Sequence, residues 1–516
     1  MSNIVQQQQA LSSLPRIIWR REAVYSIQRD CDCACSSAPA SAPLPFAPLS
    51  YSQGATALRA ASPFHTLPLT ENYQLAYIPS GNGDGDGIAV LNPPALDMLR
   101  TLSQKQSSSR IFSAWNQQWG PGVVKNALDD FLRLGFLTRD SSSPYKRHAP
   151  RPESDTLSIW LHVTDRCNLR CSYCYLPHRP IDISPEIGKA SIDAAFRSAI
   201  LHDFQRIKIK YAGGEPLLHL PLVLELHRYA KTLAERHSML LDGIVLSNGT
   251  LLTAETVGQL KSSGLRLMIS LDDLAGKGKG EDSGASNRCY PDGRSSSAAA
   301  VRAVELALAR DLIPDISITV SGRNIQDLPA LVEWALERSL PFGLNFYREH
   351  GEDQSASDLR LEDEKIIEGM RACYHVIENN LPPYSLLSSL IDRANLAFPH
   401  THTCGVGHEY MVFDGQGHIA KCQMQMEHAA ASVDDTDPLA RIRSAQSGIQ
   451  NIPVDAKEEC RACEWKYWCA GGCPLAAYRE TGRYDARSPF CRIYKSLYPE
   501  VLRLEGLRLL TYSTAS

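Results

Sequence analysis

The sequence predicts an α/β protein built around a parallel sheet, and two observations support that prediction. Between residues 157 and 348, short apolar runs typical of strands alternate with amphipathic stretches typical of helices. Six such strand–helix units in series favour parallel strands with right-handed crossovers. Six units are too few for a closed eight-fold barrel. We therefore expect an open sheet whose ligand site lies at the carboxyl ends of the strands.

The elements of this region follow from their patterns. The first helix has Ser184 as its N-cap, Pro185 at its first position and Ile192, Phe196 and Ala199 on one face. Further helices are expected over 220–236, 254–263, 296–310 and 328–339. The six strands are expected over 158–163, 206–211, 244–247, 265–271, 316–320 and 342–347.

The first 65 residues are rich in Ser, Ala, Pro and Gln, a composition typical of disordered segments. They include Cys31, Cys33 and Cys35, which we interpret as mobile surface cysteines, with metal binding as the alternative. Residues 66–145 predict a small domain, with strands over 73–78 and 88–91 and three short helices after them. A linker is expected over 141–152.

Composition limits the classes of function. The chain has 516 residues, which suggests about three domains. The net charge of −4 gives no reason to expect a nucleic-acid partner, and no apolar run is long enough for a membrane span. No signal peptide is evident and the 15 cysteines are odd in number, so we expect a cytoplasmic protein without a disulfide framework.

Cysteines directly after the first strand predict a metal cluster. Cys167, Cys171 and Cys174 have C-x3-C-x2-C spacing on one short loop. A [4Fe–4S] cluster needs a ligand on each iron, so three thiolates leave one iron open. A zinc site is the alternative, but it would need four ligands, and only His178 lies nearby.

This loop resembles the signature of the radical SAM enzymes, including the aromatic residue Tyr173 before the third cysteine. In that family S-adenosylmethionine (SAM) chelates the open iron, and one electron from the cluster releases a 5′-deoxyadenosyl radical. The resemblance implies a partial (β/α)6 barrel. It also implies that Cys167, Cys171 and Cys174 hold the catalytic cluster.

Three further strand ends are similar to family motifs for SAM. Gly213-Gly214-Glu215-Pro216 matches the motif that binds the amino group of SAM. Asn248 lies in an Asn-Gly-Thr segment after the third strand, for which a plain turn is the alternative. Ser270 and Asp272 end the fourth strand, in a segment placed near the ribose in the family. Arg288 and Asp292 in the following loop face either substrate or solvent.

A second group of cysteines resembles the SPASM domain, a C-terminal iron–sulfur module. By the family pattern, Cys460, Cys463, Cys469 and Cys491 hold an outer auxiliary cluster, and Cys404, Cys422 and Cys473 an inner one. The inner set is one thiolate short, so we expect an open iron there, or one capped by His408. A zinc module is the alternative.

The remaining segments connect these parts. We expect bridging helices over 351–403, with Cys373 in a core, an auxiliary-cluster domain over 404–495 and a closing helix in 496–516. The resemblance implies an enzyme that abstracts hydrogen from a ribosomally made peptide and installs a cross-link, fed by an external one-electron reductant. The winged-helix-like domain would bind the leader of that precursor peptide at 66–140, by strand addition to its hairpin. An unrelated small domain, a sulfatase-maturing enzyme and a non-catalytic iron–sulfur or zinc protein are the alternatives.

Overall fold

A computed structural model of the chain describes residues 13–19, 58–60, 63–79, 87–104, 109–138, 155–274, 286–349 and 354–513. Cys31, Cys33 and Cys35, the predicted linker and residues 80–86 between the two predicted strands lie outside these ranges. The predictions for them stay predictions.

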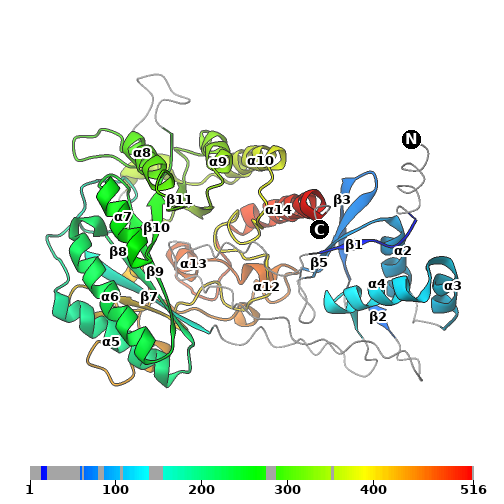
Figure 1. Ribbon diagram of the computed structural model, residues 1–516, viewed down its shortest axis with the longest axis horizontal. Helices are drawn as coiled ribbons and strands as arrows, with labels where there is room; N and C mark the ends of the chain where they lie inside the picture. The colour runs from blue at the N-terminus through cyan, green and yellow to red at the C-terminus, as the bar shows by residue number, and fades with distance from the viewer. Residues whose placement is uncertain are drawn as a thin grey trace.

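A nine-stranded sheet forms the centre of the molecule (Figure 1). Its order is β12-β11-β10-β9-β8-β7-β13-β14-β15, and the strands from β12 to β13 are parallel. The six predicted strands are confirmed as β7 to β12. The bounds are β7 (Thr156–Thr164), β8 (Arg206–Gly213), β9 (Leu240–Ser247), β10 (Arg266–Ser270), β11 (Asp315–Val320), β12 (Phe342–Phe346), β13 (Tyr410–Phe413), β14 (His418–Ala420) and β15 (Ala429–Ser432).

Helices cover one face of this sheet, as Figure 1 shows for α5 to α8. Alternate side chains of β7, such as Ile159 and Leu161, point into the apolar core beneath them. The Ser184 hydroxyl accepts a hydrogen bond from the Ile187 N–H, so the predicted cap is confirmed. The helices are α5 (Pro185–Leu201), α6 (Leu220–Arg236), α7 (Ala254–Ser263), α8 (Ser297–Leu308), α9 (Leu328–Glu337) and α10 (Asp363–Asn379), with 3-10 turns η1 (Pro216–His219) and η2 (Gln354–Leu359).

The expected sheet of six strands was too short. β13, from the C-terminal region, pairs in parallel with β7, and Tyr410 and Phe413 lie opposite Ser158 and Leu161. Within the described ranges no strand joins β12 to β15, so the sheet is open. The C-terminal region is therefore continuous with the main sheet.

The C-terminal region otherwise consists of short helices and one long one. Predicted Cys373 lies fully buried on α10, which confirms its core position. The long helix α14 packs on α10 and starts at Cys491, earlier than the predicted closing helix. These elements are η3 (Gln423–Gln425), α11 (Pro438–Ser444), η4 (Val454–Ala456), α12 (Lys466–Cys469), α13 (Pro474–Thr481) and α14 (Cys491–Tyr512).

The N-terminal region forms a second sheet, of order β1-β5-β4-β3, followed by three helices. The predicted hairpin is confirmed as β4 and β5. Disorder over 1–65 was wrong for two short segments, because β1 pairs with β5 and β2 pairs with β6. The bounds are β1 (Ile17–Ile18), β2 (Arg59–Ala60), β3 (His65–Thr70), β4 (Tyr73–Tyr77), β5 (Ile88–Leu91), α2 (Pro93–Gln104), α3 (Ser109–Trp119), α4 (Pro121–Arg133) and β6 (Leu137–Thr138).

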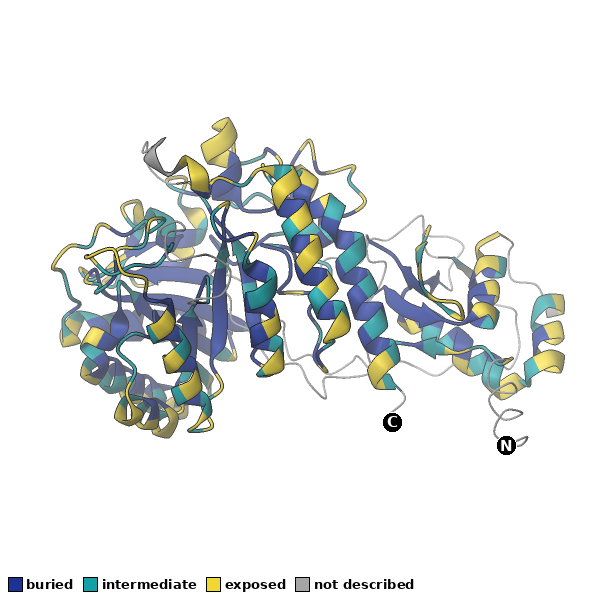
Figure 2. Ribbon diagram, turned by 90° about the horizontal axis from the view of Figure 1, so that it is seen from above, coloured by how far each residue is buried: buried dark blue, intermediate teal, exposed yellow. Residues whose placement is uncertain are grey.

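Strands β4 and β5 of this second sheet have buried residues on both faces (Figure 2). Ala76 and Ala89 face the core shared with α2 to α4, whereas Tyr77 and Val90 belong to the same core as the main sheet. Tyr77 stacks on Trp465, with ring centroids 5.9 Å apart. The N-terminal region is therefore fixed on α14 and its neighbours. In the described part of the chain, no helix combines the length and the apolar character that crossing a membrane requires.

Candidate active site

Two glycines hold the end of β8 against the cysteine loop. Gly213 has φ +142°, and a Cβ there would lie 2.3 Å from the Thr164 carbonyl oxygen. A Cβ on Gly214 would lie 2.1 Å from the Arg166 carbonyl oxygen. The N–H of Gly214 donates to Thr164 and that of Glu215 to Arg166, at 2.7 and 2.9 Å. Only glycine allows this approach, which fixes the backbone just before Cys167.

Side-chain amides then position Cys167. Asn248 Nδ2 donates to Asn168 Oδ1 at 2.9 Å and lies 3.8 Å from the Cys167 sulfur. Asn168 Nδ2 donates to the Thr250 hydroxyl at 2.7 Å, and that hydroxyl donates to Asn248 Oδ1 at 2.7 Å. The end of β9 is thereby joined to the loop by a closed ring of hydrogen bonds.

Glu215 is fully buried and forms a hydrogen bond with the backbone of Asn248, a member of this ring. Its carboxylate accepts the Asn248 N–H at 2.7 Å, the Ser247 hydroxyl at 2.9 Å and the Leu217 N–H at 3.0 Å. Burial raises the pKa of Glu215 to about 7, although these donors oppose the rise. Its carboxylate therefore positions Asn248, and Pro216 beside it opens η1.

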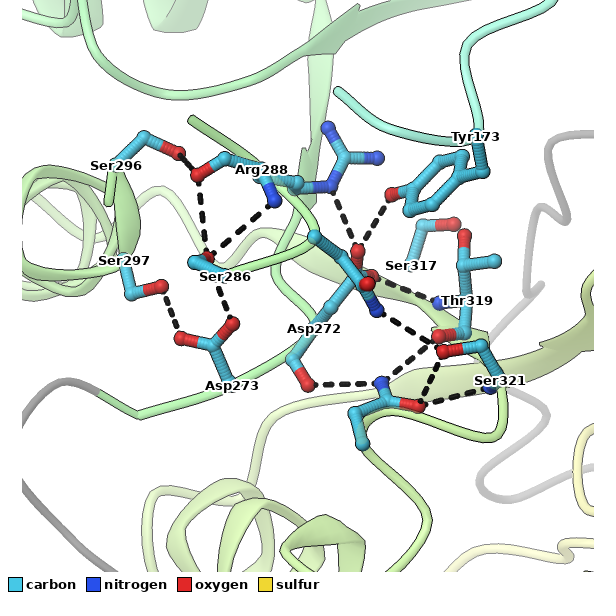
Figure 3. Close-up of polar contacts among 12 residues, drawn as sticks. Tyr173, Asp272, Asp273, Ser286, Arg288, Ser296, Ser297, Ser317, Thr319 and Ser321 are labelled. Carbon is cyan, nitrogen blue, oxygen red and sulfur yellow. Dashed lines mark hydrogen bonds and ion pairs between the residues drawn. The ribbon is translucent and has the colours of Figure 1, made fainter. Parts of the chain in front are cut away.

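Asp272 organises the end of β10 (Figure 3). Its carboxylate accepts the Tyr173 hydroxyl at 2.5 Å, Arg288 Nε at 3.1 Å and the Thr319 N–H at 2.9 Å. The Arg288 guanidinium also lies over the Tyr173 ring, 5.5 Å from its centroid. Burial raises the pKa of Asp272, and the positive charge of Arg288 opposes that rise. The loop after β10 is thus tied to the cysteine loop.

The three loop cysteines lie close enough to act on one another electrostatically. Cys167 and Cys174 both raise the pKa of Cys171, although burial is the largest cause and brings it to about 12. Burial also raises the pKa of Cys167 and Cys174. These are buried soft donors grouped at one strand end, and such a set fits an iron–sulfur cluster.

The C-terminal cysteines form two further groups. Cys463, Cys469 and Cys491 all act on Cys460, whose pKa rises to about 11, mainly through burial. The inner group brings Cys404, Cys422 and Cys473 together, with mutual effects on their pKa values. The resemblance assigns the same residues to an outer and an inner cluster, and that assignment stays a prediction. Within the described residues, no three His, Cys, Asp or Glu side chains are arranged for a single metal ion.

Arginines surround the inner group. Arg348 is buried and pairs with the fully buried Asp392, with Nη2 2.6 Å from Oδ2. Burial alone would raise the pKa of Cys473, but the charges of Arg348 and Arg393 lower it below the ordinary value. Arg479 also faces Cys473 and Cys422.

The other predicted site residues are placed as follows. Ser270 ends β10 opposite Ser317. The ring of His408 lies against that of His402, 4.1 Å between centroids, and its role as a cap stays a prediction. Of the two loop residues, Arg288 is largely buried, whereas Asp292 is exposed and pairs with Arg294.

A cavity of about 470 Å³ lies between the cysteine loop and the hairpin formed by β13 and β14. Tyr175 and Gln423, the neighbours of Cys174 and Cys422, both line it. So does His162, whose Nε2 lies 2.7 Å from Asp165 Oδ1 and whose buried Nδ1 has no protein partner in the described structure. One residue beside the cysteine loop and one beside the inner group therefore line the same cavity.

Sequence reasoning missed several of these residues. Asn168 and Thr250 lie inside quoted motifs and could have been found as polar side chains at strand ends. Arg348 lies two residues after the end of β12 and carried the same signal. Asp392 and Arg393 lie in an irregular segment that carried no signal, because only the fold brings them beside the inner group.

Comparison with known proteins finds a family match for part of the chain. Residues 161–335 match the radical SAM superfamily, which covers the cysteine loop and the ends of β8 to β11. The chain therefore contains a radical SAM domain. Family members bind SAM and [4Fe–4S] clusters, and the first cysteine group and its surroundings provide the matching donors.

Two named relatives and one solved structure show what the chain resembles beyond this domain. The chain is 26% identical over 377 residues to the Fe-coproporphyrin III synthase of Methanosarcina barkeri, across 65% of this chain and 88% of the relative. It is 25% identical to the AdoMet-dependent heme synthase of the same organism, across 67% and 97%. The solved structure of anSMEcpe with bound AdoMet and Cp18Cys peptide has a TM-score of 0.53 and 18% identity, across 70% of this chain and 99% of that one. That likeness concerns the fold alone.

Proposed function

We propose that this chain is a radical SAM enzyme that oxidatively modifies a ribosomally made peptide. The observation that supports it most is the grouping of the ten motif cysteines into a set of three at the end of β7 and two sets in the C-terminal region. A radical SAM domain needs only the first set. The other two suit a reaction in which a further electron must leave the substrate.

The residues present fit the cofactors. Cys167, Cys171 and Cys174 would hold the catalytic cluster, and Gly213, Gly214, Asn248 and Ser270 would line the SAM site. Bound together, cluster and SAM supply a 5′-deoxyadenosyl radical that removes hydrogen from an unactivated carbon. Cys460, Cys463, Cys469 and Cys491 would hold the outer auxiliary cluster and Cys404, Cys422 and Cys473 the inner one.

The chain's own residues supply position and charge. The buried carboxyl groups of Glu215 and Asp272 stand beside the loop and suit a ligand that carries a sulfonium and an ammonium group. Tyr173 and Arg288 fix the Asp272 carboxylate, and Asn248 fixes Cys167. The cavity lined by His162, Tyr175 and Gln423 is a suitable place for the substrate side chain.

The peptide class of substrate rests on the N-terminal region. Three antiparallel strands followed by three helices resemble a winged-helix peptide-recognition domain, and backbone pairing along a sheet edge would bind a leader largely regardless of sequence. The cross-link itself and the external one-electron reductant are parts of this proposal.

A second candidate is modification of a porphyrin side chain. It is favoured by the two synthases of Methanosarcina barkeri, which this chain matches over most of their own length. A porphyrin enzyme would have no use for a strand-binding domain at 66–140, and for that reason we prefer the peptide.

The test is anaerobic reconstitution with iron, sulfide, dithionite and SAM. We expect 5′-deoxyadenosine from the wild type and none from the variant with Cys167, Cys171 and Cys174 all changed to Ala. That variant should retain the iron of the C-terminal sets. The matched control Cys373→Ala alters a buried cysteine outside all three sets and should keep the product.

Substrate class is tested by co-expression with a short peptide encoded beside the gene, followed by mass spectrometry. Loss of hydrogens from that peptide supports the proposal. A wild type that cleaves SAM but changes only a sulfatase or a porphyrin would overturn the peptide assignment.

A further inference from the structure

One edge of the N-terminal sheet is covered by the chain itself. The segment 14–19, here called the resident segment, lies along β5 (Figure 1). Ile17 pairs antiparallel with Leu91, and Ile18 with Val90. Because β4 pairs with the other side of β5, this is the side that the hairpin of β4 and β5 leaves unpaired. The resident segment therefore occupies the place where an added peptide strand would pair.

The Asn92 side chain forms hydrogen bonds with the backbone of the resident segment. Its Nδ2 donates to the Leu14 carbonyl at 2.7 Å, and its Oδ1 accepts the Arg16 N–H at 2.8 Å. The same oxygen accepts the Ala95 N–H at 3.2 Å, at the start of α2. Asn92 is only 4% exposed. These contacts involve only backbone atoms of the resident segment, so they could hold another sequence equally well.

Apolar side chains anchor the resident segment on both faces of the sheet. Ile18 is 8% exposed and joins the core that contains Leu75 and Val90. Ile17 and Trp19 pack on the opposite face, against the core of α2 to α4. The Arg133 guanidinium lies 5.5 Å from the centroid of a Trp19 ring. The edge is thus suited to an apolar pair followed by an aromatic residue.

The opposite edge of the sheet is poorly suited to strand addition. It is formed by β3, where Pro68 has no N–H to offer and the pairing register shifts beside it. A peptide strand joining this sheet would therefore pair with β5.

We propose that the resident segment is an intramolecular competitor for the β5 edge, to which the incoming peptide strand of the proposed function would add. The competing strand would be an extended part of the substrate peptide with an apolar pair followed by an aromatic residue, so its identity rests on the proposed function. A tethered strand acts at an effective concentration on the order of millimolar. The apparent affinity of an incoming strand is consequently its intrinsic affinity multiplied by the fraction of molecules in which the edge is open.

The test measures the binding of a fluorescein-labelled synthetic peptide, with the sequence of residues 13–19, to the full-length protein by fluorescence anisotropy. Ile18→Asp in the protein places a charge in the core and releases the resident segment. We expect this variant to bind the peptide at least tenfold more tightly than the wild type. The same peptide carrying Ile18→Asp should not bind either protein.

Asn92→Asp locates the binding site. Aspartate keeps the acceptor oxygens for Arg16 and for the cap of α2, but it loses the donor to the Leu14 carbonyl. Added to Ile18→Asp, it should weaken peptide binding several-fold. Trp19→Ala replaces Ile18→Asp if the latter does not fold.

Equal binding by the wild type and both released variants would overturn the proposal, and so would binding that ignores Asn92→Asp. Release of 5′-deoxyadenosine by Ile18→Asp without peptide should equal that of the wild type. A failure of peptide binding with normal 5′-deoxyadenosine would therefore count against the resident segment and leave the radical SAM assignment intact.

Discussion

The cysteine loop after β7 and the inner C-terminal group both gather three thiols, but the charged groups around the two differ in their balance. The loop is held by neutral amides and by the buried carboxyl groups of Glu215 and Asp272, the latter paired with Arg288. The inner group stands among the guanidinium groups of Arg348, Arg393 and Arg479. The carboxyl groups leave the loop suited to a cationic ligand, whereas the arginines offset the charge of thiolates.

This difference predicts the largest effect at the inner group. Arg348→Met removes one partner of a buried ion pair and leaves Asp392 buried with less compensation. Breaking such a pair typically costs about 3–5 kcal/mol, so the apparent unfolding temperature should fall by several degrees in a thermal scan.

Arg483→Met is the matched control for Arg348→Met. Arg483 forms an exposed pair with Asp485, and its loss should leave the unfolding temperature unchanged. If both variants had the unfolding temperature of the wild type, the buried Arg348–Asp392 pair would not stabilise the surroundings of the inner group. The proposed difference between the two cysteine groups would then be wrong.

The next effect concerns the loop alone. Gly214→Ala would force a methyl group against the Arg166 carbonyl and displace the backbone that precedes Cys167. We expect 5′-deoxyadenosine formation to fall at least about a hundredfold, or roughly 2.7 kcal/mol, with the iron of the C-terminal sets retained. Gly258→Ala in α7, where an added Cβ would meet nothing within 4 Å, should leave product formation unchanged. Unaltered activity in Gly214→Ala would show that the close approach is not required.

The smallest predicted effect is a pH dependence of the free energy of unfolding, which Glu215 should cause and Arg348 should not. The pKa of Glu215 is raised from 4.5 to about 7 by burial, so its stabilising contribution is complete below pH 4.5 and is lost as pH rises through 7. The free energy of unfolding of the wild type should therefore fall by about 2 kcal/mol between pH 5 and pH 7, relative to Glu215→Gln. Arginines stay protonated over that range, so the Arg348 side chain itself adds no such pH dependence to the stability of the wild type. A flat difference for Glu215→Gln would mean that its carboxyl group does not titrate there.

The sequence predicted the cysteine loop and its surroundings better than it predicted the inner C-terminal group. Periodicity located β7 to β12 and α6 within a few residues, because each unit is built from neighbours in the chain. Cys167, Gly213, Gly214 and Asn248 lie at or just after strand ends, and parallel strands bring their carboxyl ends to one edge. The motif positions therefore implied their proximity.

The inner side depended on contacts between distant segments. Tyr410–Phe413 is a four-residue run that periodicity cannot assign, and its pairing with β7 joins parts that the sequence treated as separate domains. Asp392 and Arg393 have no pattern around them. The resident segment was hidden in a stretch whose composition indicates disorder, because two paired residues leave no periodic trace.

The pairing of β13 with β7 has a practical consequence for dissecting this protein. A fragment ending before residue 404 would keep all the SAM motifs, yet it would leave one side of β7 with its peptide groups exposed to solvent. Uncovered strands of this kind recruit one another, so such a fragment should precipitate or form oligomers when expressed alone. Attempts to obtain a minimal catalytic core should therefore retain at least the hairpin formed by β13 and β14.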